Sequence, residues 1–294
     1  MRPSPSMPAG NAGSGHALAD RDPAALASDP PRRAQWGDLR LRVLSAAVLA
    51  PVALAGIWYG GPSWNALIAI AGVGLALEWV ALCRAPPGVW PGFGVLAAVL
   101  AGIVLTAAGQ AQPGVAALLA GAGLVLVPHW RLAAGVPYAG LGAVALVWLR
   151  ADPVAGRGNV IFLVLAVWAS DIGAYAAGRL LGGPKLAPLI SPGKTWSGAA
   201  GGLVAAMLVG LVAGEVIAPG AAIRAAMLAA LIGAASQGGD LLESAIKRGF
   251  GVKDSGRLIP GHGGLMDRLD GLLAAAPVAA GLALLIGRGT TLWH

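Results

Sequence analysis

The acidic side chains of this sequence are concentrated near its C-terminal end. In a chain of which only 11% of residues are charged, the stretch from 240 to 270 contains Asp240, Glu243, Asp254, Asp267 and Asp270. The first two continue directly from an apolar stretch, and the last two lead directly into another. Ionisable groups at a membrane boundary are costly, so such a cluster indicates a functional site. A solvated loop of mixed charge is the alternative interpretation.

Helical spacing would bring several of these groups together. If the helix that ends near residue 239 continues, one of its faces carries Asp240, Ser244 and either Lys247 or Arg248. Asp267 and Asp270 are three residues apart and would project together from the start of the next helix. Carboxylates from two helices form an all-oxygen pocket that suits Mg²⁺ better than zinc. With lysines and arginines nearby for phosphate oxygens, the pattern indicates phosphoryl or nucleotidyl transfer.

A second polar segment begins inside an apolar stretch. Asp171 follows Ser170 there, and a carboxylate in that place needs a cation, a metal or a proton; an ion pair with Arg179 is the structural alternative. Residues 191–195 then read Ser-Pro-Gly-Lys-Thr. The last three resemble the end of a phosphate-binding P-loop, but Pro188 occupies the place of that motif's first glycine, which excludes it. A basic loop that binds nucleotide or lipid phosphates remains the interpretation.

A glycine-rich turn lies between the two acidic pairs. Residues 260–264 read Pro-Gly-His-Gly-Gly. Glycines allow backbone amides to approach an anion, although a tight turn before a helix would have the same composition. His262 could bind phosphate or cap the turn.

The elements that must position these residues are membrane helices. The 294 residues are 57% hydrophobic, with a mean hydropathy of +0.74, and this composition excludes an ordinary soluble enzyme. Apolar stretches close to the length of a membrane-spanning helix recur along the chain. We predict an all-α, polytopic transmembrane helical bundle of about nine spans. The expected spans are residues 41–59, 64–83, 90–108, 113–128, 133–149, 159–181, 197–218, 221–239 and 269–287.

The distribution of positive charge predicts the orientation. With the N-terminus in the cytoplasm, alternate threading leaves only Arg150, Arg157, Arg224 and Arg288 of the 20 basic residues on the far side. Membrane topology therefore explains the net charge of +7 better than nucleic-acid binding does. The predicted organisation is a disordered cytoplasmic tail over residues 1–36, N-terminal transmembrane helices over 37–158, and a C-terminal transmembrane catalytic region over 159–294.

The C-terminal motifs resemble those of a known family. Residues 244–270 read Ser-Ala-Ile-Lys-Arg-Gly-Phe-Gly-Val-Lys-Asp-Ser-Gly-Arg-Leu-Ile-Pro-Gly-His-Gly-Gly-Leu-Met-Asp-Arg-Leu-Asp, which is similar to the signature of phosphatidate cytidylyltransferases. Ser170-Asp171 through Arg179 and the Ile-Ser-Pro-x-Lys-Thr loop also resemble that family. One residue departs from the family pattern: Ser197 follows Trp196 where relatives usually have a glutamate.

The resemblance implies a function in phospholipid biosynthesis. CTP would condense with phosphatidic acid to give CDP-diacylglycerol and pyrophosphate, with Mg²⁺ required, with or without a second cation. The expected location is a bacterial inner membrane, with the active site cytoplasmic. The resemblance also implies a homodimer, and no nucleic acid is expected as a partner.

The resemblance also implies roles for individual residues. Catalysis is assigned to Asp240, Lys247, Arg248, Lys253, Asp267, Arg268 and Asp270. Substrate binding is assigned to Ser191, Lys194, Thr195, Ser244, His262, Gly263 and Gly264. The expected metal ligands are Asp240, Asp267 and Asp270, with Asp171 as a further candidate.

Three other functions compete with this interpretation. A CTP-dependent kinase of polyprenol or phytol would use similar helices and the same nucleotide, but the complete segment from Lys253 to Asp270 favours cytidylyl transfer. A transporter would also carry charges within the membrane. The charged residues of a transporter would lie at mid-membrane, however, whereas those of this sequence gather at one membrane boundary. A CDP-alcohol phosphotransferase is disfavoured because Asp270-Gly271 is followed by no further acidic residue.

Overall fold

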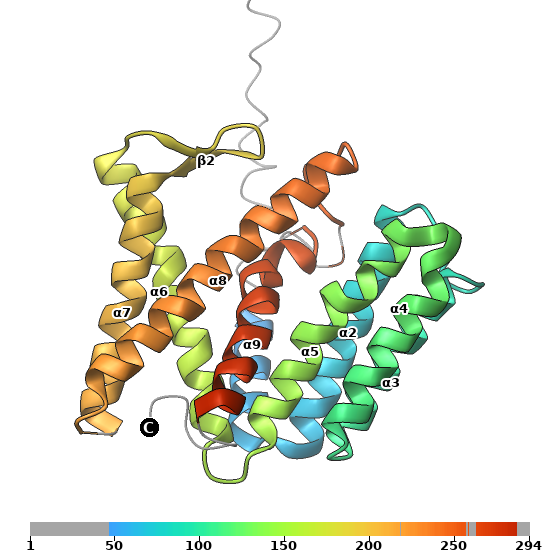
Figure 1. Ribbon diagram of the computed structural model, residues 1–294, viewed down its shortest axis with the longest axis horizontal. Helices are drawn as coiled ribbons and strands as arrows, with labels where there is room; N and C mark the ends of the chain where they lie inside the picture. The colour runs from blue at the N-terminus through green and yellow to red at the C-terminus, as the bar shows by residue number, and fades with distance from the viewer. Residues whose placement is uncertain (1–46, 218, 257, 259–262, 287–294) are drawn as a thin grey trace, which may run out of the picture.

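The structure is a computed structural model that describes residues 47–217, 219–256, 258 and 263–286. The described part is helical apart from one short hairpin (Figure 1). Its helices are Ala47–Tyr59, α2 (Gly61–Leu82), α3 (Gly92–Ala107), α4 (Ala111–Ala133), α5 (Gly135–Ala151), α6 (Gly156–Leu181), α7 (Trp196–Ile217), α8 (Ala222–Gly249) and α9 (Met266–Ile286). The predicted all-α class is confirmed. The predicted tail of residues 1–36 lies outside the described residues.

These helices have the composition of membrane spans. Within the described residues, six apolar stretches are long enough to cross a membrane, and three shorter apolar helices accompany them. Large apolar side chains such as Ile70, Leu124 and Val216 lie on the outer surface, where lipid would solvate them. The protein is therefore a polytopic membrane protein, although the described helices do not establish nine full spans.

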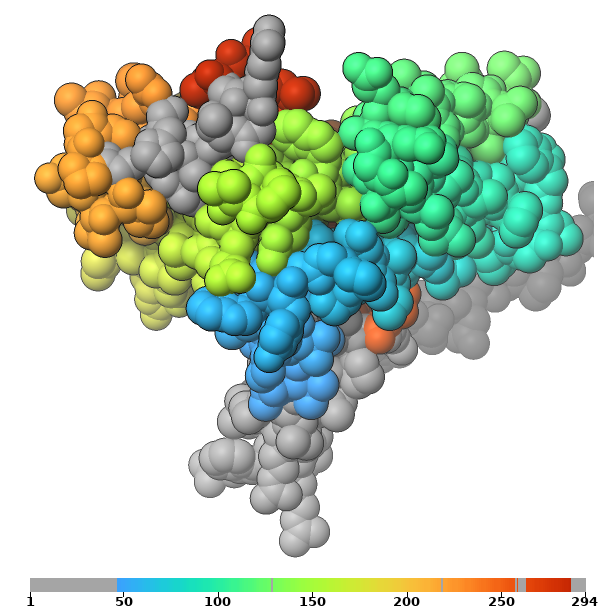
Figure 2. Space-filling model, turned by 90° about the horizontal axis from the view of Figure 1, so that it is seen from below, coloured from blue at the N-terminus to red at the C-terminus, as the bar shows by residue number. Residues whose placement is uncertain are grey.

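Two groups of helices are joined by α9. Helices α6, α7 and α8 pack together on one side and α2–α5 on the other, while α9 contacts α5, α6 and α8 (Figure 1). Small residues allow the closest approach: a Cβ built on Gly201 of α7 would lie 2.2 Å from the Ala177 Cβ of α6. Figure 2 shows the molecule from below the view of Figure 1. On this side, the helix Ala47–Tyr59 and the start of α2 lie beside the turn between α5 and α6. The helices α3 and α4 lie to one side of them, and the turn between α7 and α8 lies to the other.

Two of the polar segments fold into regular secondary structure instead of loops. The basic loop after α6 folds as an antiparallel hairpin of β1 (Lys185–Ala187) and β2 (Ser191–Thr195), with Lys185 opposite Thr195. Helix α8 continues past the predicted end of its span at residue 239 to Gly249, which meets the condition under which Asp240 and Ser244 share a face. The hairpin, the end of α8 and the start of α9 all lie at one end of the bundle (Figure 1). We call this the hairpin end.

Candidate active site

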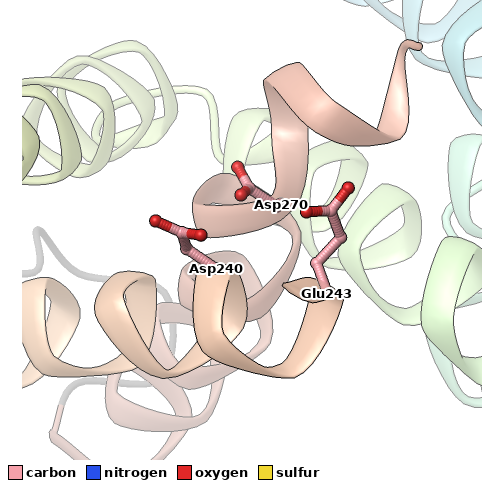
Figure 3. A group of neighbouring side chains, drawn as sticks. All are labelled: Asp240, Glu243 and Asp270. Atoms are coloured by element: carbon pink, nitrogen blue, oxygen red, sulfur yellow. The ribbon is translucent and has the colours of Figure 1, made fainter. Parts of the chain in front are cut away.

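Three carboxylates meet where α8 and α9 approach each other at the hairpin end. Asp240 and Glu243 come from α8 and Asp270 from α9, and one oxygen of each lies within 4.8 Å of the others (Figure 3). Glu243 is 1% exposed, and its Oε1 has no hydrogen-bond partner in the described part of the chain. An all-oxygen donor set of this kind suits a hard divalent cation. Asp240 and Asp270 were predicted from the sequence as ligands, whereas Glu243 occupies the place predicted for Asp267.

Asp267 lies beside this cluster and holds the segment that precedes α9. Its Oδ2 accepts hydrogen bonds from the backbone N of Ser255 at 3.1 Å, from the Ser255 Oγ at 3.0 Å and from the backbone N of Gly264 at 3.1 Å. Its Oδ1 accepts one from the Lys247 Nζ at 2.7 Å. Both oxygens are therefore engaged by the protein.

Lys247 connects Asp267 to the carboxylate cluster. Its Nζ lies 2.7 Å from the Glu243 Oε2, one turn away on α8, and 2.7 Å from the Asp267 Oδ1. The side chains of all three residues are at most 14% exposed. An ammonium between two carboxylates in so enclosed a place neutralises part of their charge and fixes the spacing of α8 and α9.

The hairpin brings a second lysine to the cluster. The Lys194 Nζ lies 2.6 Å from the Asp240 Oδ2. Thr195 is buried, and its Oγ1 accepts a hydrogen bond from the Gly198 N at 3.1 Å, so it caps the start of α7. Ser191 is partly exposed at the start of β2. The sequence-predicted Lys194 thus reaches the site, whereas Thr195 supports the hairpin.

Asp171, on α6, lies near the pair of Lys194 and Asp240. It is exposed, and its charge interacts with those of both residues. Among the described residues, Asp171 and Arg179 form no ion pair, so the structural alternative for Asp171 is not observed. Asp171 also lies outside the group of three carboxylates that could hold one ion.

The remaining described residues of the prediction lie on the end of α8, in the loop that follows it and at the start of α9, at the hairpin end. Arg248, Lys253 and Arg268 are exposed, and the Arg248 Nη1 donates to the Val252 carbonyl at 3.4 Å. Ser244 is partly buried on α8, while Gly263 and Gly264 form the approach to α9. His262 lies outside the described residues.

Sequence reasoning gave no role to Glu78, yet the structure places this residue against the signature segment. Glu78 is 3% exposed on α2, and its two oxygens accept hydrogen bonds from the backbone N of Leu265 and of Met266, each at 2.8 Å. The signal for it was present, because a carboxylate inside an apolar span is a candidate functional group. Its partners were not deducible, since they lie 187 and 188 residues away.

Ser197, the departure from the family pattern, closes the hairpin. Its Oγ donates to the Gly182 carbonyl and lies 3.0 Å from the Thr195 Oγ1. The residue thus ties the end of α6 to the start of α7.

Comparison with known proteins assigns this arrangement to a family. The profile of the cytidylyltransferase family matches residues 40–286. The chain belongs to the cytidylyltransferase family. The match extends over α2–α5, which precede all the motifs that resemble the family.

Curated members of the cytidylyltransferase family align over most of the chain. A phosphatidate cytidylyltransferase of Brucella suis is 42% identical over 245 residues, which cover 81% of this chain and 91% of that protein. One of Pseudomonas aeruginosa is 38% identical over 280 residues, covering 85% and 99%. A third, of Mycobacterium leprae, is 45% identical over 148 residues, covering 50% and 46%.

Proposed function

We propose that this protein is a nucleotidyltransferase that condenses CTP with phosphatidic acid to give CDP-diacylglycerol and pyrophosphate. The observation that carries the proposal is the carboxylate cluster of Asp240, Glu243 and Asp270, flanked by lysines, in a chain 42% identical to a phosphatidate cytidylyltransferase. Cations beside a carboxylate cluster are the groups that transfer between two phosphates requires.

The donor set supports Mg²⁺ as the cofactor. Asp240, Glu243 and Asp270 offer only carboxylate oxygens, and the buried Glu243 Oε1 has a lone pair that no described protein group uses. Mg²⁺ bound there would offset the negative charge of the phosphates. The predicted ligand role of Asp267 stays a prediction, because its oxygens already accept bonds from Lys247, Ser255 and Gly264.

The protein's own residues would bring two anions together. A phosphatidate oxygen would form a bond to the α-phosphorus of CTP, while the bond from that phosphorus to the pyrophosphate oxygen breaks. The nucleophile is already anionic, so no strong general base is needed. Lys194 at the cluster and the exposed Arg248, Lys253 and Arg268 around it would hold the phosphates.

We further propose that the hairpin end faces the cytoplasm of a bacterial cell. This end carries Arg84, Lys185, Lys194, Lys247 and Lys253, which supports a cytoplasmic side by the positive-inside rule. CTP is a cytoplasmic nucleotide, and the lipid would reach the same site laterally from the inner leaflet.

Association into a homodimer is also part of the proposal, supported by the family resemblance alone. Light scattering of the detergent-purified protein, with the detergent mass subtracted, checks it. A mass of one chain at all concentrations would contradict it.

The test of the proposed reaction is release of labelled pyrophosphate from CTP by purified protein with phosphatidic acid and Mg²⁺. Asp270→Asn should abolish release, as should removal of Mg²⁺ with a chelator. Glu215→Gln, which changes an exposed carboxylate near the end of α7 and outside the cluster, is the control and should retain turnover. Formation of CDP and a newly phosphorylated lipid would replace the proposal with a lipid kinase. The absence of turnover with any lipid would overturn both.

A further inference from the structure

Glu78 caps a helix to which it is distant in sequence. Its carboxylate accepts the backbone N–H groups of Leu265 and Met266, and Met266 is the first residue of α9. The N–H groups of a helix's first turn have no partner within the helix, and the helix dipole favours a negative charge there. The Glu78 side chain, from α2, thus supplies to α9 an acceptor that usually comes from a residue just before the capped helix.

The same carboxylate also contacts the loop between α8 and α9. The buried Ser255 Oγ lies 3.4 Å from the Glu78 Oε2 and 3.0 Å from the Asp267 Oδ2, so one hydroxyl lies between the two acids. A Cβ built on Gly256 would be 2.7 Å from the Glu78 Oε1, which shows that the loop backbone packs directly on the carboxylate.

These contacts continue to the candidate metal ligands. Asp267 binds Lys247, and Lys247 binds Glu243. Asp270 lies one turn beyond Asp267 on α9 and completes the carboxylate cluster. The point at which α9 begins therefore sets where Asp270 lies relative to the two carboxylates of α8.

We infer that Glu78 is a positioning residue, which fixes the start of α9 and so holds Asp270 against Asp240 and Glu243. This inference rests on the proposed function for its catalytic consequence, but not for its structural part. The two backbone N–H groups that donate to it and its burial place Glu78 against the site, although it comes from the half of the chain that carries no signature motif.

Two substitutions distinguish the effect of the charge of Glu78 from the effect of its side-chain length. Glu78→Gln keeps the shape but replaces one oxygen by an amide NH₂, which cannot accept from a backbone N–H. Glu78→Asp keeps the charge but is one methylene shorter, so it cannot reach both donors. Thr106→Val is the matched control, because Thr106 is also 3% exposed and its Oγ1 donates only within α3, to the Gly102 carbonyl at 2.8 Å.

The first readout is amide hydrogen exchange of the metal-free protein. The peptide that contains Leu265 and Met266 should exchange about tenfold faster in both Glu78 variants, as expected for loss of a buried hydrogen bond. Thr106→Val should leave its exchange unchanged. Should both Glu78 variants fail to fold, Gly256→Ala tests the same contact, because its Cβ displaces the carboxylate without removing it.

The second readout is the Mg²⁺ concentration that gives half the maximal rate. It should rise severalfold in the Glu78 variants and stay at the wild-type value in Thr106→Val, since a smaller folded fraction lowers the rate without changing this concentration. Wild-type exchange and a wild-type Mg²⁺ requirement in Glu78→Gln would overturn the inference. If the wild-type protein makes no CDP-diacylglycerol, the proposed function fails, and the exchange measurement alone decides the role of Glu78.

Discussion

At the scale of single residues, two lysines form ion pairs of similar length in different surroundings. Lys194 pairs with Asp240, and their side chains are 24% and 41% exposed. Lys247 lies between Glu243 and Asp267, whose side chains are 2% and 14% exposed. Exposed pairs contribute little to stability, whereas removing one partner of a buried pair leaves an uncompensated charge.

Replacing each lysine by methionine should therefore have different effects. Lys247→Met should destabilise the protein by about 3–5 kcal/mol, whereas Lys194→Met should cost about 1 kcal/mol or less. Both should lose pyrophosphate release, Lys194→Met because a phosphate-binding cation is missing. Thermal unfolding in detergent together with the labelled-CTP assay measures the two effects. Equal thermal stability of the two variants would contradict the difference in surroundings.

Most of the residues that the sequence predicted for the site lie in one charged stretch of the chain, while Lys194, which pairs with Asp240, comes from a separate loop. Asp240 and Asp270 lie at the two ends of the charged stretch 240–270, and their types and spacing were sufficient to predict a shared site. Glu243 lies in the same stretch, but its inclusion in place of Asp267 depends on how α8 and α9 are aligned along their axes. The role of Glu78 depends on partners that lie 187 and 188 residues away in the chain. Neither alignment nor long-range contact is encoded in local spacing.

At the scale of elements, the helices follow from hydropathy and the hairpin does not. Each predicted span overlaps a described helix, because backbone groups in lipid must be paired internally and an apolar stretch can do this only as a helix. The segment 185–195 is short, and its strands depend on pairing with each other and on the Ser197 contact with Gly182. These contacts form only when α6 and α7 lie side by side.

The close contact between α6 and α7 yields a prediction for its glycines. Gly201→Ala should lower the melting temperature, because the new Cβ would lie 2.2 Å from the Ala177 Cβ. Gly123→Ala in α4 is the control, since nothing lies within 4 Å of its added Cβ; there alanine should be neutral or stabilising by about 0.5–1 kcal/mol. Thermal unfolding of both variants decides. A stable Gly201→Ala protein would mean that these helices are farther apart.

At the scale of the whole molecule, the bundle has two ends of different charge. The hairpin end carries most of the described basic residues, and the opposite end carries Arg150, Arg157 and Arg224. Leu189, between β1 and β2, is 94% exposed at the hairpin end, whereas Val154, between α5 and α6, is 93% exposed at the other. These positions are suited to mapping which end faces the cytoplasm.

We expect Val154→Cys to react with a membrane-impermeant maleimide in intact spheroplasts, and Leu189→Cys to react only after the membrane is opened. The native Cys83 should contribute little background. Burial raises the pKa of its thiol from 9.0 to about 11, so the reactive thiolate is about a hundredfold scarcer at neutral pH than for an unperturbed thiol. Its labelling should accelerate as pH rises toward 11, and the unmodified protein is the control. The reverse labelling pattern would invert the proposed topology.

The cap that Glu78 provides also bears on how the chain is made. Synthesis produces α2 well before α9, so this carboxylate enters the membrane while its donors, Leu265 and Met266, do not yet exist. A nascent chain that stops short of α9 holds an acid in an apolar environment without these N–H groups, which is energetically costly. Completion of α9, the last described helix, removes that cost. Unfinished and finished chains therefore differ in the solvation of a group near the beginning of the protein.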